Sequence, residues 1–393
     1  MRLLVIVPDR LSSILDKGEF QPDYYNPGNL ADEAHLLMTN DDKPDPAPLQ
    51  YTVGTAKLFL HNYPDDLTLP QKPFPFLDRW RLNRWARDGV KLIASIAPDM
   101  IRCHGADWNA YLASRAKAAL GIPYCVSLHT QPDTDIGSRM HIAPTSTWQK
   151  RSNAFYDTVA CAGLRQADFV LPVYQNILPY CRRLGIPEER IRVCYNVLNK
   201  FHLVQKTDYA LHNPARILYV GRLVESKNPE NIIRAIAGIA NCRLTIIGHG
   251  PEGDSLKKLV KSLTLTKKVS FIDSLPNDEL CQFLPQHDLF VIHNEYWGIS
   301  KTTLEAMLTG LPVIINHRAG EPVAELQGGS VRLVENTPEA YRNAIIELLT
   351  DVNTRESLGK RAFLYSRANY DPALTEEKYV RIYQQMIENR PDR

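Results

Sequence analysis

The sequence predicts an α/β protein of two domains, each a doubly wound parallel sheet covered by helices. At 393 residues the chain exceeds a single ordinary hydrophobic core, so two domains of about 150–200 residues are expected. Short apolar runs alternate with amphipathic stretches along most of its length, which is typical of strands and helices that alternate along the chain. A polar, aperiodic stretch over residues 200–214 fits a linker between the two halves.

The second half shows the alternation most clearly. Its apolar runs predict strands near residues 217–220, 243–247, 269–272, 289–293, 312–316 and 330–334, with a helical stretch between each pair. Pro229 can open the first of these helices, because Ile232, Ile233, Ile236 and Ile239 then share one face. Parallel strands joined in this way bring their carboxyl ends to one edge of the sheet, where open α/β folds bind ligands.

The first half is less regular. Met1–Val7 reads as a core strand that is too short for a signal peptide or a membrane span. Lys17–Asp66 is rich in Pro, Asp, Asn and Tyr and predicts long loops around one helix near Leu30–Met38. At the other end of the chain, the periodic segment Thr375–Asn389 predicts a helix that could belong to either domain.

Two cations follow the strand at residues 217–220. Gly221 permits the turn out of this strand, and Arg222 and Lys227 come directly after it. An arginine can fork onto two phosphate oxygens while a lysine supplies a point charge, so the pair suits a diphosphate. Both side chains are expected to be exposed to solvent when no ligand is bound. Taken alone, the same residues could be a solvated turn.

A second polar loop follows the strand near residues 289–293. Ser300 is a good N-cap for a helix that carries Lys301, Thr302 and Glu305 in its first turns. The unpaired N–H groups and positive dipole of a helix start favour an anion. Glu305 lies one turn further in, close enough to bind the hydroxyl groups of a sugar attached to that anion.

These elements together resemble family 4 of the retaining glycosyltransferases, which have the GT-B fold of two Rossmann-like domains facing across a cleft. The resemblance rests on G-R-L-x-x-x-K from Gly221, on Gly248-His-Gly-Pro-Glu252, and on the G-x-x-x-x-x-x-E-A-M-x-x-G-x-P-V element from Gly298. In the first half, the strands that end at His104 and at His129 are similar to two strands of the family. The likeness covers roughly residues 90–350.

The resemblance implies a division of the chain. Residues 1–205 would form the acceptor domain, with a helix over 373–393 crossing back to it, and residues 206–372 would form the nucleotide-sugar donor domain. His129, Arg222 and Lys227 would be catalytic, with His129 reaching the donor sugar and phosphate. The donor would contact Gly221, Arg222, Lys227, Gly248, Glu295, Trp297, Gly298, Ser300, Lys301, Thr302 and Glu305. Neither a metal ion nor a cofactor other than the donor is expected.

The sequence departs from the family pattern at three places. The family has a glutamate eight residues before Glu305, where this chain has Trp297, and Glu295 stands two residues earlier. The family's Asn-Gly pair after the hinge strand is Asn196-Val197 here. The Gly-Gly loop after the first strand has only a distant counterpart in Pro27-Gly28.

Composition narrows the classes of protein and partner. The formal net charge of +2 gives no support for a nucleic-acid surface. Seven cysteines without close-pair spacing indicate reduced thiols in a cytoplasmic protein rather than a disulfide frame or a zinc site. The expected partners are a nucleotide-sugar donor and an acceptor that is a small molecule, a glycan or a lipid-linked molecule.

Several alternatives stay open at this stage. Asp133 and Asp135 have the D-x-D form that can hold a divalent metal. Phe74–Lys91 combines tryptophans with many cations, as a peripheral membrane helix does, although a packed and solvated helix has the same composition. A nucleotide-sugar epimerase or hydrolase, or a non-catalytic binding protein, would share the donor elements. A Rossmann dehydrogenase is disfavoured because no G-x-G-x-x-G follows the first strand.

Overall fold

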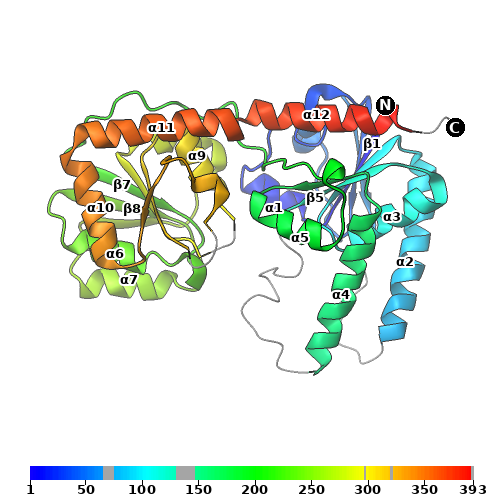
Figure 1. Cartoon of the computed structure of the whole chain (residues 1–393), viewed down its shortest axis with the longest axis horizontal. Coiled ribbons are helices and arrows are strands. Elements are labelled where there is room, and N and C mark those ends of the chain that lie inside the picture. Colours follow the sequence, from blue (N-terminus) through cyan, green and yellow to red (C-terminus); the bar gives the residue numbers. More distant parts are fainter. Residues whose placement is uncertain (65–74, 130–146, 296–297, 319–321, 391–393) are drawn as a thin grey trace. The chain divides into compact units, whose positions relative to one another are not determined.

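The computed structural model describes residues 1–64, 75–129, 147–295, 298–318 and 322–390. The chain divides into two compact units, each described by itself below (Figure 1). Unit 1 comprises Met1–Asp16, Phe20–Val197 and Thr375–Arg393, and unit 2 comprises Lys17–Glu19 and Leu198–Leu374. Residues 200–214, predicted as a linker, contain neither helix nor strand, and they belong to unit 2.

The described residues of unit 1 form a six-stranded parallel sheet in the order β3-β2-β1-β4-β5-β6. The strands are β1 (Arg2–Val7), β2 (Glu33–Met38), β3 (Lys57–Asn62), β4 (Met100–His104), β5 (Tyr124–Leu128) and β6 (Phe169–Pro172). The helices are α1 (Leu11–Asp16), α2 (Pro75–Ile96), α3 (Trp108–Leu120), α4 (Thr147–Arg165), α5 (Leu178–Arg183) and α12 (Pro372–Glu388). The strand order runs outward from β1 in both directions, which makes the sheet doubly wound.

Apolar side chains cover both faces of this sheet. Leu4 and Ile6 of β1 point into a core shared with α2, α3, α4 and α5. Their neighbours Leu3 and Val5 point into a second core shared with α1 and α12. Strands buried on both faces read as continuous apolar runs, which is why the sequence of β1 does not alternate.

The predicted helix near Leu30–Met38 is wrong. Glu33–Met38 forms β2, which pairs in parallel with β1 on one side and with β3 on the other. Leu36, Leu37 and Met38 are fully buried there. Leucine and methionine favour helices in isolation, but a short apolar run can equally be a central strand, and periodicity alone does not separate the two. The sequence reading also placed β3 inside a loop.

Unit 2 repeats the architecture in its described residues, with the strand order β12-β11-β10-β7-β8-β9. The strands are β7 (Ala215–Val220), β8 (Cys242–Ile247), β9 (Val269–Ile272), β10 (Leu289–Ile292), β11 (Val313–Asn316) and β12 (Arg332–Val334). The helices are α6 (Glu230–Ala237), α7 (Gly253–Ser262), α8 (Asn277–Phe283), α9 (Lys301–Thr309), α10 (Pro338–Thr350) and α11 (Val352–Tyr370). Each strand predicted in this half is present.

Helix α6 shows why the apolar pattern in this half of the sequence predicted its helices correctly. Pro229 caps the helix, and Ile232, Ile233 and Ile236 are fully buried on its inner face. The fourth predicted position, Ile239, lies just beyond the end of the helix and is also buried. The helix predicted over Thr375–Asn389 is α12. None of the helices in the described part of the chain is long and apolar enough to cross a membrane.

Candidate functional site

The loop after β7 carries the two predicted cations. Arg222 is exposed, whereas Lys227 is half-buried in a short 3-10 helix (Glu225–Lys227), so the expectation that both would be exposed is wrong for Lys227. The buried hydroxyl of Tyr219 donates a hydrogen bond to the Lys227 carbonyl and fixes the turn. Burial, with a smaller contribution from the charge of Arg222, lowers the pKa of Lys227 to about 8. A desolvated ammonium beside a second cation favours the arrival of an anion.

A glycine loop after β8 holds the β7 loop in place. Gly248 has φ of +147°, and a Cβ built there would lie 1.9 Å from the carbonyl oxygen of Gly221. The Leu223 N–H donates to the His249 carbonyl at 3.0 Å, and the Glu252 N–H donates to the Leu223 carbonyl at 2.9 Å. Only glycine allows backbones to approach this closely. Gly248 therefore shapes the site through the position of the Gly221 loop.

The start of α9 lies against the end of β7. Ser300 caps the helix by accepting a hydrogen bond from the Thr303 N–H at 3.2 Å, as its sequence position predicts. The Thr302 hydroxyl donates to the carbonyl of Val220, the last residue of β7, at 3.4 Å. The structure thus brings the predicted helix start to the same strand end as Arg222 and Lys227. Two cations and the positive end of a helix dipole then share one edge of the sheet.

Glu305 is buried inside unit 2. One carboxylate oxygen, Oε1, accepts a hydrogen bond from the Asn277 amide at 2.9 Å and lies 3.9 Å from the ammonium of Lys301. The other oxygen, Oε2, is buried and has no hydrogen-bond partner among the described residues. Burial raises the pKa of Glu305. A buried acceptor without a partner is costly, and a ligand hydroxyl would satisfy it.

The loop between β10 and α9 reaches the same place. The Glu295 N–H donates to the Ser226 carbonyl at 2.8 Å, next to Lys227. The Glu295 side chain is exposed and lies 3.4 Å from the imidazole of His293. The carbonyl of Gly298 accepts hydrogen bonds from Asn294 and Arg318. Trp297, the predicted sugar contact at which this chain departs from the family that it resembles, lies outside the described residues. Asp133 and Asp135 also lie outside them.

His129 belongs to unit 1 and follows β5. Its Nδ1 lies 3.0 Å from Oδ1 of Asn196. Burial and then the charge of Arg102 lower the pKa of His129 to about 4, so the imidazole is neutral at pH 7. Its position at the carboxyl end of a parallel strand is the one that the sequence predicts.

Two contributors to the site carried no recognisable motif in the sequence. Asn277 donates to Glu305 from α8, 28 residues away in the chain. Arg318 follows β11 and holds the Gly298 carbonyl at 3.1 Å. Its place at a strand end is the one signal that could have drawn attention to it. Burial lowers the pKa of Arg318 to about 10.

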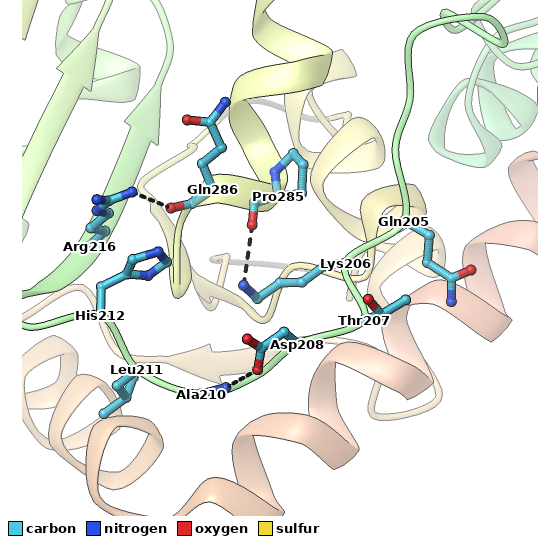
Figure 2. Close-up of a pocket in the computed structure, with 10 residues that line it drawn as sticks. All are labelled: Gln205, Lys206, Thr207, Asp208, Ala210, Leu211, His212, Arg216, Pro285 and Gln286. Carbon is cyan, nitrogen blue, oxygen red and sulfur yellow. Dashed lines mark hydrogen bonds between the residues drawn. The ribbon is translucent and has the colours of Figure 1, made fainter.

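A separate hollow of about 420 Å³ lies at the opposite, amino edge of the unit 2 sheet (Figure 2). Lys206, His212 and Arg216 extend toward it, and each of them already has a protein acceptor. Lys206 donates to the Pro285 carbonyl at 3.2 Å, and Arg216 donates to the Gln286 carbonyl at 3.4 Å. His212 lies 2.9 Å from Asp288. The hollow contains none of the predicted site residues.

Two doubly wound α/β units, one with cations and a capped helix start at a strand end, are the features expected of a GT-B protein. Comparisons with known proteins agree. Residues 33–200 match the family model described as Glycosyltransferase Family 4, and residues 205–364 match the model of glycosyl transferases group 1. The structure of HepE from Anabaena in complex with UDP has a TM-score of 0.71 over 98% of this chain and 100% of that chain, at 16% sequence identity.

Two relatives of this chain in other organisms are also named as glycosyltransferases. An uncharacterized glycosyltransferase of Methanocaldococcus jannaschii is 23% identical over 62% of this chain and 65% of its own. A D-inositol 3-phosphate glycosyltransferase of Corynebacterium glutamicum is 30% identical over 44% of each chain. The matches thus span less than two thirds of the length of either relative. The two family models together cover most of the chain and support a family 4-like glycosyltransferase of the GT-B fold.

Proposed function

We propose that this glycosyltransferase moves a hexose from a nucleoside-diphosphate sugar to an acceptor hydroxyl, with retention of configuration at the anomeric carbon and without a metal ion. The observation that carries the proposal is the meeting of Arg222, Lys227 and the α9 start at the end of β7. The donor needs no further cofactor in this scheme.

The chemistry that such a site must perform is the stabilisation of a departing diphosphate. Negative charge accumulates on the diphosphate as the glycosidic bond breaks, and preorganised cations and helix N–H groups stabilise it. Lys227 is desolvated before the ligand arrives, so its interaction with a phosphate is stronger than that of a fully hydrated ammonium. In the proposed complex, Oε2 of Glu305 accepts a hydrogen bond from a ribose hydroxyl.

The proposed retention of configuration rests on the resemblance to the family and not on a nucleophilic side chain. The resemblance implies attack on the same face of the sugar, assisted by the leaving phosphate, and it implies that His129 contacts the donor. HepE, one of the structural neighbours, has been crystallised with UDP and with UDP-glucose. UDP-sugars are therefore the first donors to test. Peripheral contact of helix α2 with a membrane stays an alternative, and the expected classes of acceptor (a small molecule, a glycan or a lipid-linked acceptor) stay predictions.

The test is product analysis after exhaustive treatment with EDTA. A panel of UDP- and GDP-hexoses is incubated with the protein, with and without a panel of sugar and polyol acceptors, and the anomeric configuration of any product is read by NMR. Transfer with retention in EDTA supports the proposal. Donor turnover that is independent of acceptor would instead indicate a hydrolase or epimerase, and donor binding without turnover would indicate a non-catalytic protein.

Matched variants connect the activity to the site. Arg222→Ala and Lys227→Ala should each lower turnover by about 10²- to 10³-fold, the typical cost of one preorganised charge stabiliser. Arg234→Ala is the control, because Arg234 is a cation of the same unit that pairs with Glu230 on the exposed side of α6. Near-full turnover in either of the first two variants would refute the diphosphate assignment.

A further inference from the structure

A pair of histidines stands at the carboxyl edge of the unit 1 sheet. His104 ends β4, and His129 follows the neighbouring strand β5. Their rings stack with centroids 5.4 Å apart and an interplanar angle of 26°. Ligands of open α/β sheets bind at this edge. The predictions from sequence gave a functional role to His129 alone.

Both histidines carry a polar atom without a partner. Nε2 of His104 and Nε2 of His129 are buried and have no hydrogen-bond partner among the described residues. The His104 residue as a whole is 5% exposed. A buried polar atom without a partner costs about 1–3 kcal/mol, so two neighbouring ones call for a ligand or water that would satisfy them.

Burial, reinforced by a buried cation, keeps the two rings neutral. Arg102 precedes His104 by two residues, so both side chains leave the same face of β4. Arg102 is fully buried against the ring of Tyr379 at 4.3 Å and has no carboxylate within ion-pair distance in the described residues. Burial, reinforced by Arg102, lowers the pKa of His104 well below its ordinary value, as it does for His129. The pair therefore offers uncharged hydrogen-bonding atoms at pH 7.

The hydrogen bonds of Asn196 fix the tautomer of His129. The Asn196 amide nitrogen donates to the Tyr174 hydroxyl at 2.9 Å, which leaves its Oδ1 facing Nδ1 of His129 at 3.0 Å. Nδ1 must then carry the proton, and the neutral Nε2 is an acceptor. An acceptor can bind a hydroxyl group but repels a phosphate oxygen that has no proton. The resemblance had implied contacts of His129 with both sugar and phosphate.

Aromatic rings complete the surroundings of His104. The rings of Tyr24 and Tyr25 lie 6.2 Å and 5.9 Å from it, centroid to centroid. Tyr25 is buried and Tyr24 half-buried. A neutral imidazole pair beside aromatic faces suits a ligand with hydroxyl groups and apolar C–H faces, which is the chemistry of a sugar or cyclic polyol.

We propose that His104 is a second ligand-binding histidine, and that with His129 it binds neighbouring hydroxyl groups of a neutral sugar or polyol. The inference rests on the proposed function, because it assigns the sugar-binding part of that reaction to named atoms of unit 1. The hydroxyl groups can come from the hexose of the donor or from the acceptor, and both have the same chemistry.

Kinetics of His104→Phe and His104→Gln in the full-length protein test the proposal. Phe keeps the aromatic ring and removes the nitrogen atoms, whereas Gln restores a hydrogen-bonding group. We expect His104→Phe to raise KM by about 3- to 10-fold, the value of one lost hydrogen bond, and Gln to recover part of it. A rise in the donor KM assigns the hydroxyls to the donor hexose, and a rise in the acceptor KM assigns them to the acceptor. Binding of bare UDP, measured by calorimetry, should not change.

A buried histidine of unit 2 provides the control. His287 is 3% exposed and has its Nδ1 hydrogen-bonded to the Phe283 carbonyl, so His287→Gln should leave both KM values unchanged. If His104→Phe unfolds at a higher temperature than the parent and keeps both KM values, the unpaired Nε2 of His104 only lowers the stability of the fold, and the proposal is wrong. Saturation-transfer NMR with glucose and myo-inositol tests the histidine site separately from the proposed transferase function. Binding by the parent that is lost in His104→Phe would support the histidine site even if the protein had no transferase activity. Equal binding by parent and variant would overturn it.

Discussion

Lys227 is the residue whose protonation couples most directly to the proposed ligand. Its pKa of about 8 in the unliganded protein reflects burial next to Arg222. A diphosphate favours the charged form and raises this pKa, so binding near pH 8 should take up as much as about half a proton. UDP itself is fully ionised at that pH, because the second pKa of a phosphate is about 6.

Calorimetric titration of UDP in buffers of different ionisation enthalpy measures this uptake. Affinity should be nearly constant from pH 6.5 to 7.5 and weaken as the pH rises through 8, where the free enzyme loses the lysine proton. Lys227→Met should bind UDP more weakly and without proton uptake at pH 8. An unchanged uptake in that variant would mean that another group titrates.

At the scale of an element, the start of α9 has both a structural and a binding role. Ser300→Ala removes the N-cap hydrogen bond and should lower the free energy of unfolding by about 1 kcal/mol. Thr337→Ala removes the equivalent cap of α10 in the same unit, where the Thr337 side chain accepts from the Ala340 N–H at 3.2 Å. Both variants should lose similar stability in denaturant titrations, and only Ser300→Ala should weaken UDP binding. Equal affinities in the two variants would remove α9 from the anion site.

The glycine loop after β8 makes a steric prediction at the same scale. In Gly248→Ala the new Cβ would clash with the Gly221 carbonyl at 1.9 Å, whereas in Gly329→Ala the Cβ meets no heavy atom within 4 Å. Gly329 has φ of +67° and Gly248 has φ of +147°, so Gly329→Ala measures the cost of a left-handed backbone without a clash, about 1–2 kcal/mol. Gly248→Ala should cost clearly more, about 3 kcal/mol or above, and should weaken UDP binding because the Arg222 loop must move. Similar losses of unfolding free energy in the two variants would contradict the close approach.

At the scale of the whole molecule, buried neutral histidines predict acid sensitivity in both units. Burial lowers the pKa of His129 in unit 1 and of His287 in unit 2 to about 4, against about 6.5 in the unfolded chain. The unfolded chain therefore binds protons first as the pH falls. Stability is retained above about pH 7 and is lost between pH 6.5 and pH 4, up to about 3 kcal/mol for each histidine.

Denaturant unfolding at pH 7, 5.5 and 4.5 measures that loss. His287→Gln removes one titrating group and should flatten the dependence of unit 2 stability on pH. His202→Gln replaces an exposed histidine of the same unit and is the matched substitution control. A parent protein that is equally stable at pH 7 and 4.5 would show that these side chains do not stay neutral in the fold.

The sequence by itself determined the fold class and most of unit 2. Its strands are bounded by turns and separated by helices with a clear apolar face, as in α6, so local pattern and final structure agree there. Motif order placed Arg222, Lys227, Ser300 and Glu305 on the loops and the helix start where they are found. Such features are local, because a strand end or an N-cap depends on only a few neighbouring residues.

Only the tertiary structure decided the rest. Residues 33–38 became the strand β2 because β1 and β3 pair with it on both sides, a long-range effect that overrides helix propensity. Lys227 acquired its low pKa from burial, and Glu305 its unpaired oxygen from packing against Asn277. The pairing of His104 with His129, which are 25 positions apart in the chain, depends on two strands that are adjacent in the sheet. Desolvation and contact between distant segments have no signal in local sequence, because they arise only when the chain has folded.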